Sequence, residues 1–210
     1  MVRTKMRTEN RYKYWVALPL LALAWNELVF YGGRYLARGL PQLDMSLPLD
    51  ERIPFLPWTV LIYIGCFVFW AVNYVICARL ERPAALRFYL ADFLMKGICL
   101  LSFVVLPAAM ERPEVTGGGI WESAVRLLYF IDEPNNLFPS LHCAVSWLCW
   151  AGIRGERRVP AWYRHASLIM AFAVAVSTLT VKQHVIVDTI SGIILAEAMW
   201  QLAGAATPRR

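Results

Sequence analysis

The sequence has few charged residues and few histidines for its length. Only 17% of its 210 residues are Asp, Glu, Lys or Arg, whereas a soluble domain usually contains about 25%. Hydrophobic residues make up 59% of the chain, which excludes a disordered protein and argues against a water-soluble globule. The five cysteines lie inside apolar runs at spacings that match no zinc or redox motif, so we expect them to be buried as small apolar residues.

Long apolar runs account for most of the chain. Six spans of roughly 20 residues would occupy about 120 positions, which is close to the apolar content. We therefore predict an all-α fold, a polytopic helix bundle in a membrane bilayer that forms a single domain over residues 1–210. The six predicted transmembrane helices cover residues 14–37, 57–78, 88–110, 138–153, 163–181 and 185–203, and an amphipathic segment over 121–130 is expected at the membrane surface or against the bundle.

The positions of the basic residues predict how the bundle is oriented. Cytoplasmic ends of membrane proteins are enriched in Lys and Arg. Such residues precede the first span, follow the second and fourth spans and close the chain: Arg3, Lys5, Arg7, Arg11, Lys13, Arg79, Arg82, Arg87, Arg154, Arg157, Arg158, Arg164, Arg209 and Arg210. We expect both termini to be cytoplasmic. Because the basic residues lie between apolar runs rather than in one patch, they do not indicate nucleic-acid binding.

Two of the three histidines stand where predicted spans begin. His142 follows Pro139 and Ser140 at the start of the fourth span, and His184 precedes the sixth. One span inward and one span back separate the two histidines, so both imidazoles should reach the same membrane face. Asp188 follows His184 by four residues, which on a helix brings the two side chains within hydrogen-bonding range. A carboxylate on one ring nitrogen fixes the tautomer and leaves the other nitrogen free as a base or nucleophile.

A structural role is the alternative for these residues, as polar groups that reach from helix ends toward the interface. Two cations, Lys182 and Arg112, are expected on the same face as the histidines. Ionisable groups at membrane depth are costly and are functional candidates by default. The concentration of such groups at one face favours a catalytic site over residues 110–190.

The order of these groups resembles that in the type 2 phosphatidic acid phosphatase superfamily, and in its branch of sphingomyelin and inositol phosphorylceramide synthases. The family carries a Lys and an Arg-Pro six residues apart, then Pro-Ser-Gly-His, then Ser-Arg, five residues, His, three residues and Asp. The corresponding segments here are Arg112-Pro113, Pro139-Ser140-Leu141-His142, and Ser177-Thr178 followed by His184 and Asp188. The resemblance covers about residues 50–200.

Three positions depart from the family pattern. Val105 stands where the first motif has Lys, Leu141 replaces the Gly of the second motif, and Thr178 replaces the Arg of the third. The synthase-like branch tolerates similar changes. These departures weaken the transfer of a substrate from the phosphatidic acid phosphatases proper.

The resemblance implies a membrane lipid phosphatase that needs no cofactor and no metal. In the implied mechanism His184, oriented by Asp188, attacks phosphorus to form a phosphohistidine, and His142 acts as the general acid and then the general base. The lipid phosphate would be held at the extracytoplasmic (periplasmic or lumenal) face by Arg112, Ser140 and Lys182. Its substrate would be a lipid phosphomonoester or diphosphate. The alternatives are a phosphotransferase that moves a phospho-headgroup to a lipid alcohol and, from another class, a silent scaffold or lipid transporter.

Other polar residues are expected to be structural. Asp92 and Lys96, four residues apart in the third span, should form an internal ion pair. Asn26 and Glu27 in the first span should face the bundle interior. Asp132, which precedes the second motif, is expected in a solvated loop, with contact to a cationic or hydroxylated headgroup as the alternative.

Overall fold

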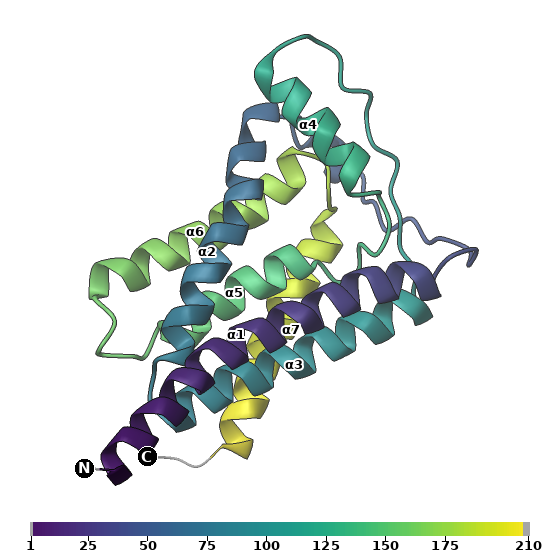
Figure 1. Ribbon diagram of the computed structural model, residues 1–210. Helices are drawn as coiled ribbons and strands as arrows, with labels where there is room; N and C mark the ends of the chain where they lie inside the picture. The colour runs from purple at the N-terminus through teal and green to yellow at the C-terminus, as the bar shows by residue number, and fades with distance from the viewer. Residues whose placement is uncertain (1, 208–210) are drawn as a thin grey trace.

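The computed structural model describes the backbone of residues 2–207 and the side chains of residues 14–207. Within these residues the regular structure is helical, and one isolated backbone bridge joins Leu43 to Ala108. In chain order the helices are α1 (Val2–Leu36), η1 (Asp50–Arg52), η2 (Pro57–Thr59), α2 (Val60–Ala78), α3 (Arg82–Val105), α4 (Ile120–Ile131), α5 (Leu141–Ile153), α6 (Ala161–Thr180) and α7 (Ile186–Ala206), as labelled in Figure 1. The predicted all-α fold is confirmed, and so is the amphipathic helix, which is α4.

Four helices in the described part of the chain are long and apolar enough to cross a membrane. These candidate spans are Tyr14–Leu36, Pro57–Ala78, Arg82–Val105 and Ile186–Ala206. Helix α5 has 13 residues, which extend about 20 Å and fall short of a hydrocarbon core of about 30 Å. Helix α6 has 20 residues but does not reach the hydropathy of the other four. The apolar helices support a membrane protein, and the six-span topology stays a prediction.

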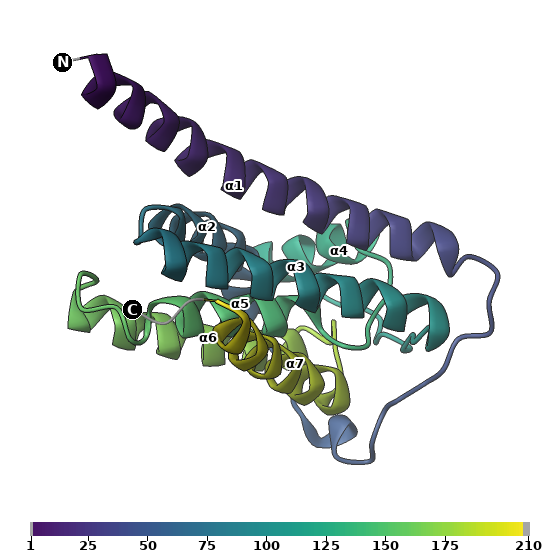
Figure 2. The same cartoon turned by 90° about the horizontal axis from the view of Figure 1, so that it is seen from below.

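The beginning of α1 and the end of α7 lie at the same end of the bundle in both ribbon views (Figures 1 and 2). Seven of the basic residues that predict a cytoplasmic location for this end lie outside the described side chains, namely Arg3, Lys5, Arg7, Arg11, Lys13, Arg209 and Arg210. The orientation in the membrane therefore stays a prediction.

Helix α5 occupies the centre of the bundle. It packs against α2, α3, α6 and α7, while α1 lies along α3 and α2 (Figure 2). Ten of the 13 residues of α5 are buried, which explains why its sequence is apolar on every side. All five cysteines are buried and unpaired by disulfides, as expected from their apolar surroundings.

A buried polar cluster joins α1, α2 and α3. The Lys96 ammonium donates hydrogen bonds to Asp92 Oδ2 (3.0 Å), to the Tyr74 hydroxyl (3.2 Å) and to the Ala22 carbonyl of α1 (3.3 Å). The Tyr74 hydroxyl in turn donates to Asp92. Asp92 and Lys96 are each 1% exposed, so the predicted internal ion pair is confirmed.

A glycine allows α5 and α7 to approach closely beside the histidines. A Cβ atom on Gly192 would lie 2.5 Å from the carbonyl oxygen of Ser140 and 3.3 Å from the backbone nitrogen of Ala144. At the same contact, the Ser140 N–H donates to the Asp188 carbonyl over 3.0 Å. The start of α5 and the first turn of α7 are therefore held together through their backbones.

Candidate active site

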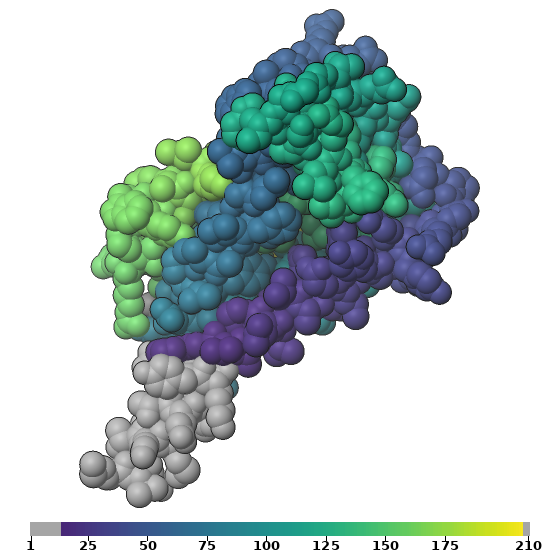
Figure 3. Space-filling view, turned by 45° about the horizontal axis from the view of Figure 1, so that its top comes forward, coloured from purple at the N-terminus to yellow at the C-terminus, as the bar shows by residue number. Residues whose placement is uncertain are grey.

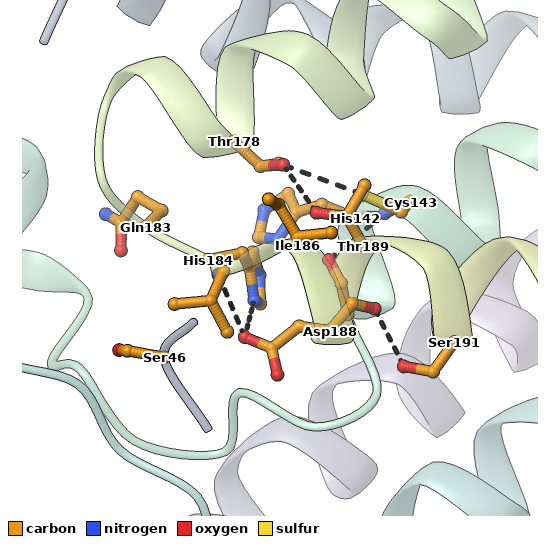
Figure 4. A network of polar contacts seen from close by, with 12 residues as sticks. Ser46, His142, Cys143, Thr178, Gln183, His184, Ile186, Asp188, Thr189 and Ser191 are labelled. Carbon is orange, nitrogen blue, oxygen red and sulfur yellow. Dashed lines mark hydrogen bonds and ion pairs between the residues drawn. The ribbon is translucent and has the colours of Figure 1, made fainter. Parts of the chain in front are cut away.

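His184 and Asp188 are in contact at the start of α7. His184 Nδ1 lies 3.4 Å from Asp188 Oδ2, and the same oxygen accepts the backbone N–H of Val185 over 3.1 Å (Figure 4). His184 is 6% exposed and Asp188 is fully buried. The contact expected from their spacing is present, but its geometry differs. His184 precedes the helix rather than lying on it, because α7 begins at Ile186 and Asp188 closes its first turn.

His142 lies in the first turn of α5 and faces His184. The centroids of the two imidazole rings are 5.9 Å apart, although the residues come from different helices. Aromatic side chains of α2 surround the His142 ring, with the Tyr63 centroid at 4.4 Å, Trp70 at 5.5 Å and Phe67 at 5.9 Å. The structure therefore brings together the two histidines and the carboxylate singled out in the sequence.

Ser140, predicted to bind phosphate, forms the N-cap of α5. Its Oγ accepts the backbone N–H of Cys143 over 3.3 Å, and the residue is fully buried. An N-cap oxygen satisfies one of the unpaired N–H groups at a helix start. Ser140 thus fixes the turn that carries His142.

Lys182, the second predicted phosphate ligand, connects two loops. Its backbone has φ of 54°, and its ammonium donates to the carbonyls of Asp50 (2.9 Å) and Ile53 (2.7 Å). Desolvation lowers the pKa of Lys182, while the Asp50 carboxylate opposes that shift. Asp50 also accepts the N–H of Ile186 at the start of α7 over 2.8 Å. The two residues fasten the segment around η1 over the turn that holds His184.

Arg112, the third predicted ligand, lies half-buried and lines the same cavity as His184. It donates to the Asp132 carbonyl over 2.6 Å and to the side chain of Gln183, and its guanidinium stacks 4.5 Å from the Tyr129 ring centroid. Desolvation lowers the pKa of Arg112, and the charge of Asp132 acts in the opposite direction. Its Nε is buried without a hydrogen-bond partner within residues 14–207, so this cation has a donor left for a ligand.

Sequence reasoning missed Arg34 and Tyr63, which connect Asp132 to the surroundings of His142. Asp132 forms an ion pair with Arg34 of α1 (3.1 Å) and accepts a hydrogen bond from the Tyr63 hydroxyl (3.2 Å). The Tyr63 oxygen also lies 3.3 Å from His142 Nδ1. Asp132 is thus held by protein groups rather than in a solvated loop. No local motif marks Arg34 or Tyr63, because each stands alone in an apolar run.

Cavities of opposite character meet at the two histidines. An apolar cavity of about 380 Å³ lies between α1, α2 and α4 and reaches His142, and Figure 3 shows this face of the molecule. On the other side, a polar cavity of about 530 Å³ is lined by His184, Arg112 and Lys182. A small cavity of about 20 Å³ touches both histidines. Asn26 and Glu27 both line the apolar cavity, so they face the space between the helices as expected, and Glu27 is exposed.

The chain matches no protein-family model, no curated protein and no solved structure. The assignment of chemistry therefore rests on the sequence motifs and on the geometry of the site. Among the side chains of residues 14–207, no group of three His, Cys, Asp or Glu is placed to hold a metal ion.

Proposed function

We propose that this protein is an integral-membrane lipid phosphatase that hydrolyses a lipid phosphomonoester or diphosphate through a phosphohistidine intermediate. The observation that carries the proposal is the placement of two facing imidazoles, one of them backed by a buried carboxylate, between an apolar and a polar cavity. A lipid phosphate has the same division, with an apolar chain on one side of the phosphorus and water on the other.

In the first chemical step, Nε2 of His184 attacks phosphorus, because Nδ1 faces Asp188. A phosphorus–nitrogen bond forms while the bond to the lipid oxygen breaks, and protonated His142 gives its proton to that oxygen. In the second step, His142 takes a proton from water, which attacks the phosphohistidine and releases inorganic phosphate. Arg112 stabilises the charge on the phosphoryl oxygens, since phosphoryl transfer depends mainly on positioning and charge stabilisation.

The proposed topology has six spans, with the site on the extracytoplasmic side of a cell membrane. In the proposed topology α5 would begin below the membrane surface, at the level of the two histidines, so its 13 residues would not need to cross the whole hydrocarbon core. The apolar cavity between α1, α2 and α4 would receive the lipid chain from the bilayer. The polar cavity would open to water.

A second candidate function is a phosphotransferase that moves a phospho-headgroup from one lipid to a lipid alcohol. It is favoured by the polar cavity beside His184, which is lined by five acidic residues: Asp44, Asp50, Glu51, Glu111 and Glu114. Carboxylates attract a cationic or hydroxylated headgroup and repel a bare phosphate. In this reaction His184 would take the phospho-headgroup from the donor lipid, whose alcohol leaves with a proton from His142, and the hydroxyl of the acceptor lipid would then attack this headgroup-bearing phosphohistidine instead of water.

Incubation of the purified protein with defined lipids tests both candidates. Phosphatidate and an isoprenyl diphosphate report hydrolysis through released phosphate, and a choline phospholipid with diacylglycerol or ceramide reports headgroup transfer by thin-layer chromatography. We expect turnover to be retained in EDTA and abolished by His184→Gln. His165→Gln is the matched control, because His165 is the third histidine and lies in α6. Activity that EDTA abolishes and a divalent ion restores would overturn the mechanism.

A further inference from the structure

The hydroxyl of Tyr63 lies between a carboxylate and the imidazole of the proposed general acid. It is 3.2 Å from Asp132 Oδ2 and 3.3 Å from His142 Nδ1. The other carboxylate oxygen of Asp132 accepts a hydrogen bond from Arg34. These four side chains come from α1, α2, α5 and the segment after α4, so their alignment results from the tertiary fold.

The direction of each hydrogen bond follows from the chemistry of its partner. A carboxylate that is paired with a guanidinium can only accept, so the Tyr63 hydroxyl must donate its proton to Asp132. The lone pairs of the Tyr63 oxygen then face His142, and only a protonated Nδ1 can complete the contact. The neutral imidazole therefore carries its proton on Nδ1 and leaves Nε2 unprotonated.

We infer that Tyr63 and Asp132 are positioning residues that hold His142 in its Nδ1–H tautomer, with Arg34 fixing the orientation of the carboxylate. The inference rests on the proposed function, in which Nε2 of His142 exchanges protons with the lipid oxygen and with water. Neither Tyr63 nor Asp132 needs to touch the reacting atoms. Their effect is to determine which nitrogen of the His142 imidazole is unprotonated and can exchange protons with the substrate.

The substitution Asp132→Asn should reverse the tautomer. Because Arg34 donates to one oxygen of this side chain, the new amide places its carbonyl toward Arg34 and its NH₂ toward Tyr63. The amide then donates to the Tyr63 oxygen, whose own proton turns toward His142 Nδ1. The imidazole must accept at Nδ1 and carry its proton on Nε2, where it can no longer act as a base.

Asp132→Asn and Tyr63→Phe should therefore have effects on kcat that do not add. Loss of the correct tautomer lowers the kcat of a hydrolase by up to about 10⁴-fold. We expect kcat to fall by about 10²- to 10⁴-fold in Asp132→Asn, but by only about tenfold in Tyr63→Phe, which leaves the imidazole free to adopt either tautomer. The double variant should match Tyr63→Phe, because without the hydroxyl the amide cannot reverse the tautomer. KM should change less than about twofold throughout.

A merely structural role predicts a different pattern. If Asp132 only stabilised the fold, the double variant would be at least as impaired as Asp132→Asn, and that result would overturn the inference. Tyr89→Phe is the matched control, since it removes another buried tyrosine hydroxyl, one that donates to the Tyr74 carbonyl away from the histidines. We expect the activity of this variant to be retained.

The tautomer can also be read without any substrate. In protein labelled with ¹⁵N-histidine, His142 is assigned from the signals lost in His142→Gln, and its nitrogens should report Nδ1–H in the unsubstituted protein and Nε2–H in Asp132→Asn. An Nε2–H signal in the unsubstituted protein would overturn the inference. If the tautomer reverses as expected while no lipid phosphate is hydrolysed, the proposed function fails and the control of the tautomer stands.

Discussion

The close approach of α5 and α7 at Gly192 should control turnover. The methyl group of Gly192→Ala would lie 2.5 Å from the Ser140 carbonyl oxygen, whereas an ordinary contact requires about 3.5 Å. The two helices must therefore separate by roughly 1 Å where Gly192 of α7 meets the first turn of α5, which carries His142. Such a shift costs about 1–3 kcal/mol of stability. A misplacement of about 1 Å lowers catalysis by about 100-fold, so we expect kcat to fall by about that factor.

Gly65→Ala provides the matched control for this prediction. The nearest atom to a Cβ on Gly65 is Met170 Cε at 3.9 Å, which is an ordinary contact. Both substitutions gain the same helix propensity, about 1 kcal/mol, so a difference between them reports the contact alone. Phosphate release in mixed micelles gives kcat, and thermal unfolding followed by tryptophan fluorescence gives Tm. Normal turnover and an unchanged Tm in Gly192→Ala would refute the argument that this contact positions the site.

Three further predictions test the membrane topology and two polar contacts. A cysteine at Gly118 should react with an impermeant thiol reagent in intact cells and one at Gly155 should not, because the proposed topology puts them on opposite sides of the membrane; the reverse pattern would invert the topology. Lys96→Met should lower the free energy of unfolding by about 3–5 kcal/mol by leaving Asp92 as an unpaired buried charge, and Asp92→Asn in that background should restore part of the loss. Lys182→Met should increase proteolysis around η1, because it removes both hydrogen bonds that fasten this segment. A large loss of kcat with normal protease resistance would instead indicate that Lys182 binds phosphate directly.

Helices that consist of one continuous apolar run could be predicted from the sequence, but the residues at which they begin were predicted less accurately. The run predicted at 88–110 is α3, which begins six residues earlier because Pro83 occupies its first turn and suits a helix start. The basic side chains of its first two turns, Arg82 and Arg87, concealed it, since they make the segment look like a connection. Conversely, α5 begins three residues later than predicted, where Ser140 caps it.

The contacts of the site also differ in how far they could be predicted from the sequence. His184 and Asp188 are separated by four residues, so their contact could be predicted from local spacing. The contacts of Asp132 with Arg34 and Tyr63 join residues 98 and 69 positions apart, and only the packing of α1 and α2 brings them together. Sequence periodicity cannot identify such partners, because a single polar residue in an apolar run has no local signature.

The meeting of an apolar and a polar cavity at the histidines has a consequence for steady-state kinetics. Under the proposed function, the dephosphorylated lipid returns to the bilayer through the cavity between α1, α2 and α4, while phosphate leaves into water past His184. The two products therefore inhibit on different concentration scales. The lipid acts through its mole fraction in the membrane and phosphate through its molarity in solution. Diluting the membrane with inert lipid should relieve inhibition by the lipid product but not inhibition by phosphate. The substrate and the lipid product therefore diffuse in the two dimensions of the membrane, whereas phosphate diffuses in the three dimensions of the solution.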